Sequence, residues 1–265
     1  MTMTSNATGT QERPRDGAFV LGTFIDAVDQ ESARRRILEW ATARQSRAVY
    51  LCNVHSVVTA DSDPQFQLVL DGADLAAPDG APVAWAWRRL GPPVPHRVSG
   101  PDLMWHLLGD AERRQLRVYF YGSSATTLAR LRQAAITAYP GLQIAGMHSP
   151  PYRPLTNHEQ QALVDNINAT RPHMVFVGLG CPKQEAWIMA RRGEIAAVML
   201  GVGAAFDFHA GVIRRAPRWM RDYGLEWLHR LGTNPRRLAR RYLVTNSVFM
   251  LRFIQQWLFK RKADA

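Results

Sequence analysis

This chain is poor in cysteine and in lysine. Its 265 residues include two cysteines, Cys52 and Cys181, which lie far apart and lack the spacing of a metal site. That scarcity argues against a disulfide-built domain and indicates two reduced thiols in a cytosolic protein. Of the 33 basic residues, 30 are Arg, a bias that suits bidentate recognition of phosphate but that genomic base composition would produce equally.

Long hydrophobic runs are also missing. The segment 1–17 is polar and has no apolar central run, so we expect no signal peptide and predict a disordered N-terminal tail there. The apolar stretch 248–259 is interrupted by Arg and Gln and is shorter than the roughly 20 apolar residues that a bilayer requires. A transmembrane helix is therefore not expected.

Acidic residues are scarce near the C-terminus. Residues 212–262 contain 13 Lys plus Arg and two acids, whereas residues 1–211 contain 20 basic and 19 acidic residues. Such blocks of like charge usually contact phosphates, an anionic membrane or nucleic acid. Because Phe253, Trp257 and Phe259 lie among cations, we predict an amphipathic helix on an anionic membrane. The alternative is a C-terminal helix that packs on the body and has a solvated cationic end.

The first 211 residues alternate between short apolar runs and longer amphipathic stretches. The runs predicted as strands are 48–52, 75–77, 116–121, 142–147, 173–178 and 196–201. The stretches predicted as helices are 30–43, 82–90, 101–113, 125–138, 157–169 and 182–191. This order predicts an α/β fold, a Rossmann-like parallel sheet covered by helices, over 18–211. Residues 212–265 are predicted to form a basic helical appendage, interrupted at Pro217 and Pro235.

Glycine-rich loops follow three of the predicted strands. Ligands of open parallel sheets bind at the carboxyl ends of the strands, where glycines let backbone amides approach a diphosphate. Three such loops on one rim therefore predict a nucleotide site. Its candidate residues are Gly122, Gly178, Gly180, Cys181, Pro182, Gln184, Gly201, Gly203, Phe206 and Asp207. The dinucleotide fingerprint and the Walker P-loop are both absent, which disfavours a nicotinamide enzyme.

Polar residues complete the same rim. Asn53 follows the first predicted strand, Asp79 follows the second, and Arg97 precedes the next helix. A carboxylate on a strand-end loop is a candidate general base, and Arg97 is a candidate to hold a phosphate or to orient that carboxylate. The alternatives are structural, because Asp79 could cap the helix near Pro82 and Asp102 could favour a helix N-terminus.

Other candidate catalytic groups have simpler structural explanations. Asp61 and Asp63 form a DxD motif, but Asp63 before Pro64 is typical of a helix N-cap, and no further ligand cluster accompanies it. We therefore predict no metal site. His55 and His209 lie near the rim and are rival bases, although a lone His more often makes structural hydrogen bonds. Cys181 has no adjacent activating His, so nucleophilic catalysis is not expected.

Several motifs occur in the order found in one enzyme family. They are APDG at 77–80, RVSGPDL at 97–103, VGLGCPKQE at 177–185, GVGAAFDFHAG at 201–211, RRAPRWM at 214–220 and GLEWLHRL at 224–231. Over residues 24–241 the chain resembles the WecG/TagA/CpsF glycosyltransferases, glycosyltransferase family 26. The resemblance implies transfer of a sugar from a UDP-sugar to a polyprenyl-diphosphate-linked sugar, with inversion and without metal or other cofactor. It also implies a peripheral enzyme at the cytoplasmic face of the membrane that makes teichoic acid, surface antigen or exopolysaccharide.

The resemblance also assigns roles to residues. Asp79 is similar to the base that activates the acceptor hydroxyl, with Asn53, Arg97 and Gln184 around the sugar and diphosphate. The loops 178–184 and 201–207 resemble the UDP pocket, with Asp207 as a ribose ligand. Three appendage arginines match family residues that fold over the site: Arg230, Arg237 and Arg240. Leu51 stands where the family often has Thr, so we expect a hydroxyl contact to be missing there.

Two function classes remain at this level. The first is the transferase, whose donor sugar is of the ManNAc, ManNAc uronic acid or glucose type. The second is a nucleotide-binding module, RNA-associated or regulatory, whose basic tail contacts RNA. No RNA-binding signature occurs and the tail is apolar, so we expect a membrane partner and no nucleic acid. A homo-oligomer stays open.

Overall fold

The fold is built around one sheet of six parallel strands. The structure is a computed structural model that describes residues 15–91, 97–223, 225–233 and 235–263, with the backbone alone for 222, 230, 233, 235–242 and 260–263. The strand order is β4-β3-β8-β7-β5-β6. The strands are β3 (Arg47–Cys52), β4 (Leu75–Pro78), β5 (Arg117–Gly122), β6 (Gln143–His148), β7 (Met174–Gly178) and β8 (Val198–Gly201). The predicted fold class is thus confirmed, with strand ends within two residues of the predicted ones.

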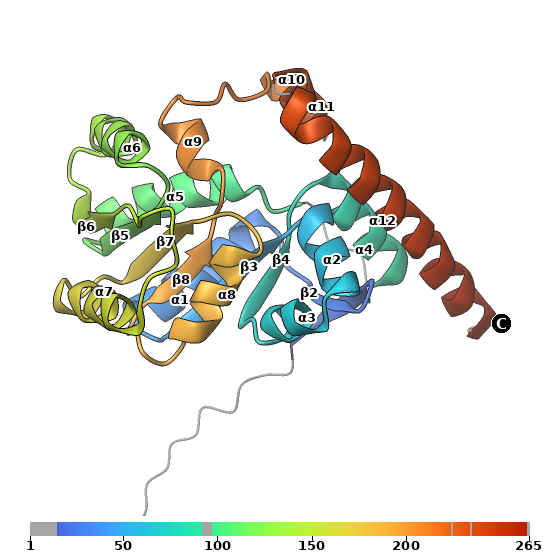
Figure 1. The fold of residues 1–265 in the computed structure, drawn as a ribbon, viewed down its shortest axis with the longest axis horizontal. Coiled ribbons are helices and arrows are strands. Elements are labelled where there is room, and N and C mark those ends of the chain that lie inside the picture. Colours follow the sequence, from blue (N-terminus) through green and yellow to red (C-terminus); the bar gives the residue numbers. More distant parts are fainter. Residues whose placement is uncertain (1–14, 92–96, 224, 234, 264–265) are drawn as a thin grey trace, which may run out of the picture.

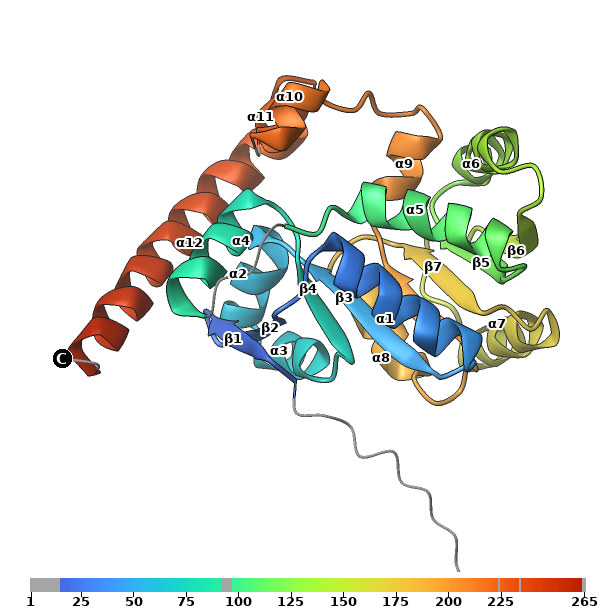
Figure 2. The same cartoon turned by 180° about the vertical axis from the view of Figure 1, so that it is seen from behind.

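Helices cover both faces of this sheet (Figures 1 and 2). The helices on one face are α1 (Gln30–Thr42), α5 (Gly100–Arg113) and α6 (Ala125–Ala138). Those on the other are α2 (Val54–Ser62), α3 (Pro64–Asp71), α4 (Ala81–Leu90), α7 (Asn157–Ala169) and α8 (Lys183–Arg191). Successive strand residues alternate between the two cores: Val49 and Leu51 belong to the first, Tyr50 and Cys52 to the second. Burial on both faces explains why the strands are continuous apolar runs.

A hairpin precedes the sheet and was not predicted. It consists of β1 (Gly17–Val20) and β2 (Thr23–Asp26). Arg15 forms an ion pair with Asp26, whose carboxylate also accepts a hydrogen bond from the Ala76 backbone at 2.7 Å. Residues 15–17 of the predicted tail therefore belong to the fold, which corrects that boundary. The rest of the tail lies outside the described residues.

Helices follow the last strand, as predicted. They are α9 (Ala205–His209), α10 (Arg218–Asp222), α11 (Glu226–Thr233) and α12 (Pro235–Ala263). Figure 1 shows α10 and α11 beyond α9, with α12 running back along the body beside α2 and α4. Phe249 and Phe253 of α12 are buried, and the Phe253 ring lies 4.9 Å from that of Trp85 in α4. The expected exposure of Phe253 is therefore wrong, because this residue belongs to the core face of α12.

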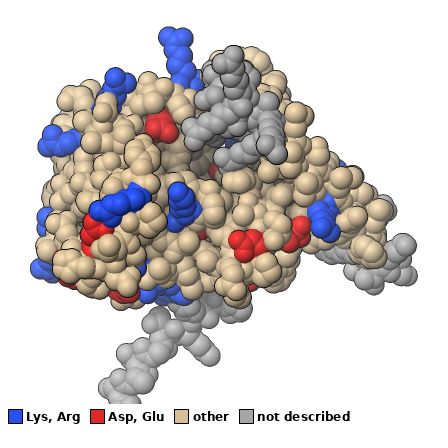
Figure 3. Space-filling model, viewed as in Figure 1, with Lys and Arg blue, Asp and Glu red and all other residues tan. Residues whose placement is uncertain are grey.

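The opposite face of α12 is exposed and apolar. Its side chains Leu243, Leu251 and Leu258 are 69%, 65% and 50% exposed, and Phe259 is exposed as well. In Figure 3, the part of the α12 arm that is not grey is mostly uncharged, because Arg252 is the one charged residue among the described side chains of this helix, 243–259. Within the described residues, no helix has both the length and the apolar character needed to cross a membrane.

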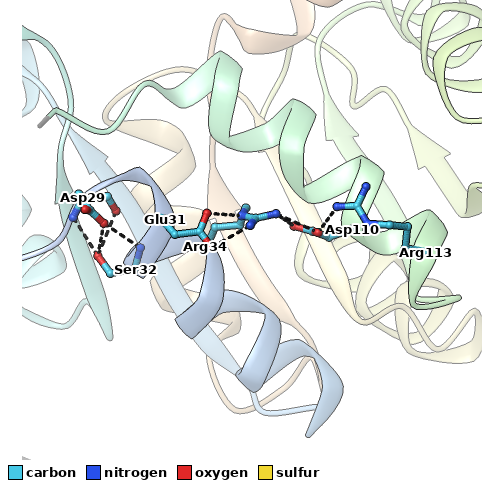
Figure 4. A network of polar contacts seen from close by, with 6 residues as sticks. All are labelled: Asp29, Glu31, Ser32, Arg34, Asp110 and Arg113. Carbon is cyan, nitrogen blue, oxygen red and sulfur yellow. Dashed lines mark hydrogen bonds and ion pairs between the residues drawn. The ribbon is translucent and has the colours of Figure 1, made fainter.

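A charged network joins α1 to α5 (Figure 4). Asp29 caps α1 and accepts from the Ser32 amide at 2.8 Å. One turn further along α1, Arg34 donates to Glu31 and to both carboxylate oxygens of Asp110, at 3.0 and 2.7 Å. Arg113 donates to the same carboxylate. The two helices are thereby fixed against each other on the sheet.

Candidate active site

The strand register places three predicted residues side by side. In the parallel pairing of β3 with β4, Cys52 lies opposite Pro78, and the Asp79 amide donates to the Cys52 carbonyl at 2.9 Å. The next segment extends the row, because the Val98 amide donates to the Pro78 carbonyl at 2.9 Å and Val98 bridges to Asp79. Asn53, Asp79 and Arg97 therefore follow one another across the carboxyl rim of the sheet, as the sequence predicted.

Asn53 lies between β3 and α2, at the N-cap position of α2. Its Oδ1 accepts from the backbone amides of His55 and Ser56, at 3.0 and 3.3 Å, and the Ser56 hydroxyl accepts from the Asn53 amide. This capping box holds the side chain in one orientation. The acceptor oxygen is committed to the helix, which leaves the amide NH2 group as the part that can bind a ligand.

Asp79 lies at a sharp turn between β4 and α4. The N-cap position of α4 is Gly80, whose φ of +85° is one that residues with a side chain rarely adopt. The N-cap position that the structural alternative gave to Asp79 is thus held by Gly80, and Asp79 lies one residue before it. Asp79 is partly exposed at the rim.

The glycine loops allow the chain segments to approach closely. Gly122 has φ +115°, and a Cβ there would come within 2.7 Å of the Gly178 backbone on the neighbouring strand. A Cβ on Gly178 would lie 2.6 Å from the ring of Phe206, which is 1% exposed. The Phe206 ring therefore packs directly against Gly178 and leaves no room for a side chain there. Gly180 and Gly203 also have positive φ, at +79° and +51°, and Cys181 and Pro182 lead directly into α8.

Gln184 and Glu185 form a buried pair beneath these loops. Gln184 Nε2 donates to Glu185 Oε1 at 2.9 Å, and the two residues are 5% and 1% exposed. The Gln184 amide group packs on Gly201, where a Cβ would come within 3.0 Å of Nε2. Burial raises the pKa of Glu185, and the hydrogen bond from Gln184 offsets this only in part. Sequence reasoning did not single out Glu185, although the VGLGCPKQE motif ends on it, because the local pattern does not reveal that this carboxylate is buried.

Asp207 lies on the short helix α9, where the appendage begins. Its carbonyl accepts from the Val212 and Ile213 amides, at 2.9 and 3.1 Å. Its side chain is partly exposed. The loop that follows β8 is therefore tied directly to the first residues of the appendage.

Arg97 connects the rim to the appendage. One of its terminal nitrogens donates to the Arg221 carbonyl at 2.7 Å and lies 3.9 Å from a Glu226 oxygen. Five positions later, Asp102 receives both terminal nitrogens of Arg215, which also contacts the Ser99 hydroxyl. The appendage therefore lies on the rim beside Asp79, an arrangement that no local pattern in the sequence reveals.

Asp102 keeps its negative charge in this position. Burial by itself would raise its pKa, but hydrogen bonds from Arg215 and Ser99 and the charges of Arg215 and Arg221 outweigh it and lower the pKa to about 2. Asp102 does lie in the first turn of α5, as its structural alternative proposed. In addition it fixes Arg215.

The rival bases have structural contacts. His209 Nε2 donates to the Pro101 carbonyl at 2.8 Å, and its ring stacks on Trp105 at 4.2 Å, so it joins α9 to α5. Burial lowers its pKa, an effect that the hydrogen bond to Pro101 only partly offsets. His55 lies in the first turn of α2, with Nδ1 3.5 Å from the Thr59 hydroxyl.

The DxD motif has a structural explanation. Asp63 is the N-cap of α3 and accepts from the Gln65 and Phe66 amides, at 3.0 and 3.2 Å, with Pro64 in the first turn, as predicted. Among the described residues, no cluster of three or more His, Cys, Asp or Glu could hold a metal ion.

Some predicted residues remain outside this description. The side chains of Arg230, Arg237 and Arg240 lie outside the described residues, so their roles stay predictions. Leu51 is buried and packs at the start of α5, where a Cβ on Gly100 would meet Leu51 Cδ1 at 2.8 Å. The effect of the missing hydroxyl at this position also stays a prediction.

Comparison with known proteins agrees with the sequence motifs. The family described as "Glycosyl transferase WecG/TagA/CpsF family" matches residues 18–263. An N-acetylglucosaminyldiphosphoundecaprenol N-acetyl-beta-D-mannosaminyltransferase of Bacillus spizizenii (strain ATCC 23059 / NRRL B-14472 / W23) is 34% identical, over 82% of this chain and 84% of the relative. Proteins of the same name from Bacillus subtilis (strain 168) and Staphylococcus aureus (strain NCTC 8325 / PS 47) are each 30% identical. They cover 83% and 72% of this chain and 81% and 74% of their own lengths.

Proposed function

The chain belongs to the WecG/TagA/CpsF glycosyltransferase family, and from this premise we propose that it transfers a sugar from a UDP-sugar to a polyprenyl-diphosphate-linked sugar. The names of its relatives specify N-acetyl-β-D-mannosamine as the sugar and N-acetylglucosaminyldiphosphoundecaprenol as the acceptor. We therefore take UDP-ManNAc as the first donor to test. In this proposal residues 18–211 form the catalytic and donor-binding domain, and residues 212–265 complete the site and dock on the membrane.

One observation carries the proposal. Asn53, Asp79 and Arg97 are consecutive along the carboxyl rim, next to three glycine-containing loops in which a side chain would clash or would need a positive φ. A polar row that contains one carboxylate and one guanidinium fits a reaction in which a hydroxyl loses a proton and a diphosphate leaves. The alternative, an RNA-associated or regulatory module, has no corresponding observation in its favour.

In the proposed mechanism, Asp79 accepts the proton of the acceptor hydroxyl as that oxygen attacks the anomeric carbon of the donor. The bond between this carbon and the UDP oxygen breaks from the opposite side, which inverts the anomeric centre. Negative charge that develops on the UDP is offset by the N-terminus of α8 and by Arg97. Arg230, Arg237 and Arg240 are the further arginines that we assign to this role.

The direct test is a transfer assay with a panel of UDP-sugars and a short-chain polyprenyl-diphosphate GlcNAc acceptor. We expect turnover with UDP-ManNAc and formation of a β-linked disaccharide, whose anomeric configuration is read by NMR. Absence of transfer with every UDP-sugar would contradict the proposal. Turnover in EDTA should equal turnover without it, whereas loss on chelation with recovery by Mg²⁺ or Mn²⁺ would require a metal.

Membrane docking is the second part of the proposal. The exposed face of α12 presents Leu243, Leu251 and Leu258 to solvent, and the segment that contains it carries most of the net charge. Apolar side chains beside cations bind anionic lipid surfaces. Flotation with anionic liposomes, measured against retention of RNA, tests it. Binding to RNA without binding to liposomes would favour the second function class.

A further inference from the structure

Five charged side chains meet where the appendage lies on the rim. They are Arg97, Asp102, Arg215, Arg221 and Glu226, with exposed fractions of 22%, 33%, 20%, 26% and 16%. Three are cations and two are anions, so the cluster carries one surplus positive charge. All five lie within or directly beside the segments that join Asp79 to the appendage.

The two carboxylates in the cluster are held differently. Asp102 receives two hydrogen bonds from Arg215, the longer at 2.8 Å. Glu226 lies 3.6 Å from Arg215 Nε and 3.9 Å from a terminal nitrogen of Arg97, distances that are too long for hydrogen bonds. Its Oε1 is buried and accepts no hydrogen bond from any described residue. Glu226 is therefore attracted to Arg97 and Arg215 by charge but forms no hydrogen bond with either of them.

Unused donors surround the same position. The Nε groups of Arg215 and Arg221 are both buried, and neither has a hydrogen-bond acceptor among the described residues. A buried N–H without an acceptor is unfavourable, and a guanidinium is well suited to a phosphoryl group because its planar donors match the oxygens. An oxygen that replaced the Glu226 carboxylate and came closer to Arg215 Nε would satisfy a donor that the carboxylate does not reach.

We propose that this cluster binds one phosphoryl group of a diphosphate, and that Glu226 occupies the place of that group when no ligand is bound. Glu226 is the first residue of α11, so it leaves the cluster by a shift of that helix. The phosphoryl oxygens then pair with Arg97, Arg215 and Arg221. The choice of diphosphate rests on the proposed function, in which both donor and acceptor contain one.

The test is calorimetric titration of the full chain with inorganic pyrophosphate and, separately, with UDP. Removal of the competing charge in Glu226→Gln should tighten pyrophosphate binding by about tenfold. Arg215→Gln should weaken it by about tenfold or more, because a charge-assisted contact is lost. Glu194→Gln, which neutralises another Arg-paired carboxylate just before β8, at the opposite edge of the sheet, is the matched control and should leave the affinity unchanged.

The outcomes separate the sources of the phosphoryl group. Tighter pyrophosphate binding by Glu226→Gln with unchanged UDP binding assigns the cluster to the acceptor, and tighter binding of both assigns it to the donor. Unchanged or weaker binding of both overturns the inference and makes Glu226 a structural tie. If Glu226→Gln does not fold, Glu226→Asp, which shortens the reach of the carboxylate, must show the tightening instead. If the variants show this pattern but the wild-type chain transfers no sugar, only the proposed function is refuted.

Discussion

Helix α5 has a carboxylate near each end, and each is bonded by at least one arginine from another segment. At the end far from the rim, Asp110 is bonded by Arg34 through both oxygens and by Arg113 (Figure 4). At the rim end, Asp102 is bonded by Arg215 and lies 3.6 Å from Arg221. Within the described residues, the first network has no buried polar atom without a partner, whereas the second has buried Nε groups that donate to nothing.

This difference separates a structural network from one prepared for a ligand. Around Asp110 every charged group has a hydrogen-bond partner, so the network is complete and joins α1 to α5. Around Asp102 the donors outnumber the acceptors and the appendage contributes the surplus, next to the rim that carries Asp79. Substitutions at the two ends should therefore act on different properties, stability at one end and activity at the other.

The largest effect is expected at the rim itself. Asp79→Asn should lower turnover by roughly a hundredfold or more, because the amide cannot accept the proton of the acceptor hydroxyl. UDP affinity, measured by calorimetry, should stay nearly unchanged, since the base acts on the acceptor. Turnover close to wild type would move the role of base to His55 or His209.

Asp110→Asn tests the structural network at the other end of α5. We expect a loss of about 3 kcal/mol in the free energy of unfolding, because Arg34 would keep a partly buried charge with a weakened partner. Urea denaturation measures that loss, and turnover per folded molecule should be unchanged. Asp102→Asn is the counterpart and should alter the KM for the acceptor more than the stability. A pattern in which both variants change only stability would remove the distinction.

The two faces of α12 allow the same separation within one helix. Replacement of Leu243, Leu251 and Leu258 by Ser should weaken binding to anionic liposomes by at least about tenfold, since anchoring scales with buried apolar area. Turnover on a soluble short-chain acceptor should be spared. Phe253→Ser should instead lower the melting temperature, because this ring is buried against Trp85. Unchanged liposome binding by the triple variant would exclude the exposed face as the docking surface.

The smallest effect is expected from acid. The folded pKa of Asp102 is about 2, below its ordinary value of 3.8, so its contacts stabilise the docked appendage above pH 3.8. That contribution should be constant from pH 8 to about 5 and should be lost as the pH falls through the folded pKa. Hydrogen exchange of residues 212–222 at a series of pH values measures it. Release of this segment already near pH 6 would point to a different titrating group.

Much of the body could be predicted from sequence because its strands are buried on both faces. Runs such as 116–121 and 173–178 are apolar throughout, and the rim residues follow from the rule that ligands bind at strand ends. The hairpin 17–26 was missed because it is fixed by tertiary contacts, among them the bond from the Ala76 amide to Asp26. Helix α2 was missed because its nine residues mix apolar and polar side chains without a clear helical period.

The candidate site also contains residues that the sequence could identify and residues that it could not. Asn53, Asp79 and the glycine loops lie at strand ends, so local pattern and family resemblance sufficed to identify them. Arg215 and Glu226 became candidates only when the fold brought them to Arg97, which contacts a carbonyl 124 positions away. The buried face of α12 was also misjudged at Phe253, since aromatic residues beside cations fit a membrane surface and a core equally well until packing is known.

The contacts of Gln256 have a consequence for synthesis of the chain. This side chain accepts from the Leu21 amide at 3.0 Å and donates to the Phe19 carbonyl at 2.8 Å, so the last helix satisfies backbone groups at the turn of the first hairpin. During translation the Leu21 amide lacks this partner until Gln256, 235 positions later, has been added to the chain. Until then the hairpin edge is open to pairing with any other strand. A nascent or prematurely ended chain should therefore be the form most prone to aggregation, and it should depend on chaperones in a way that the completed chain does not.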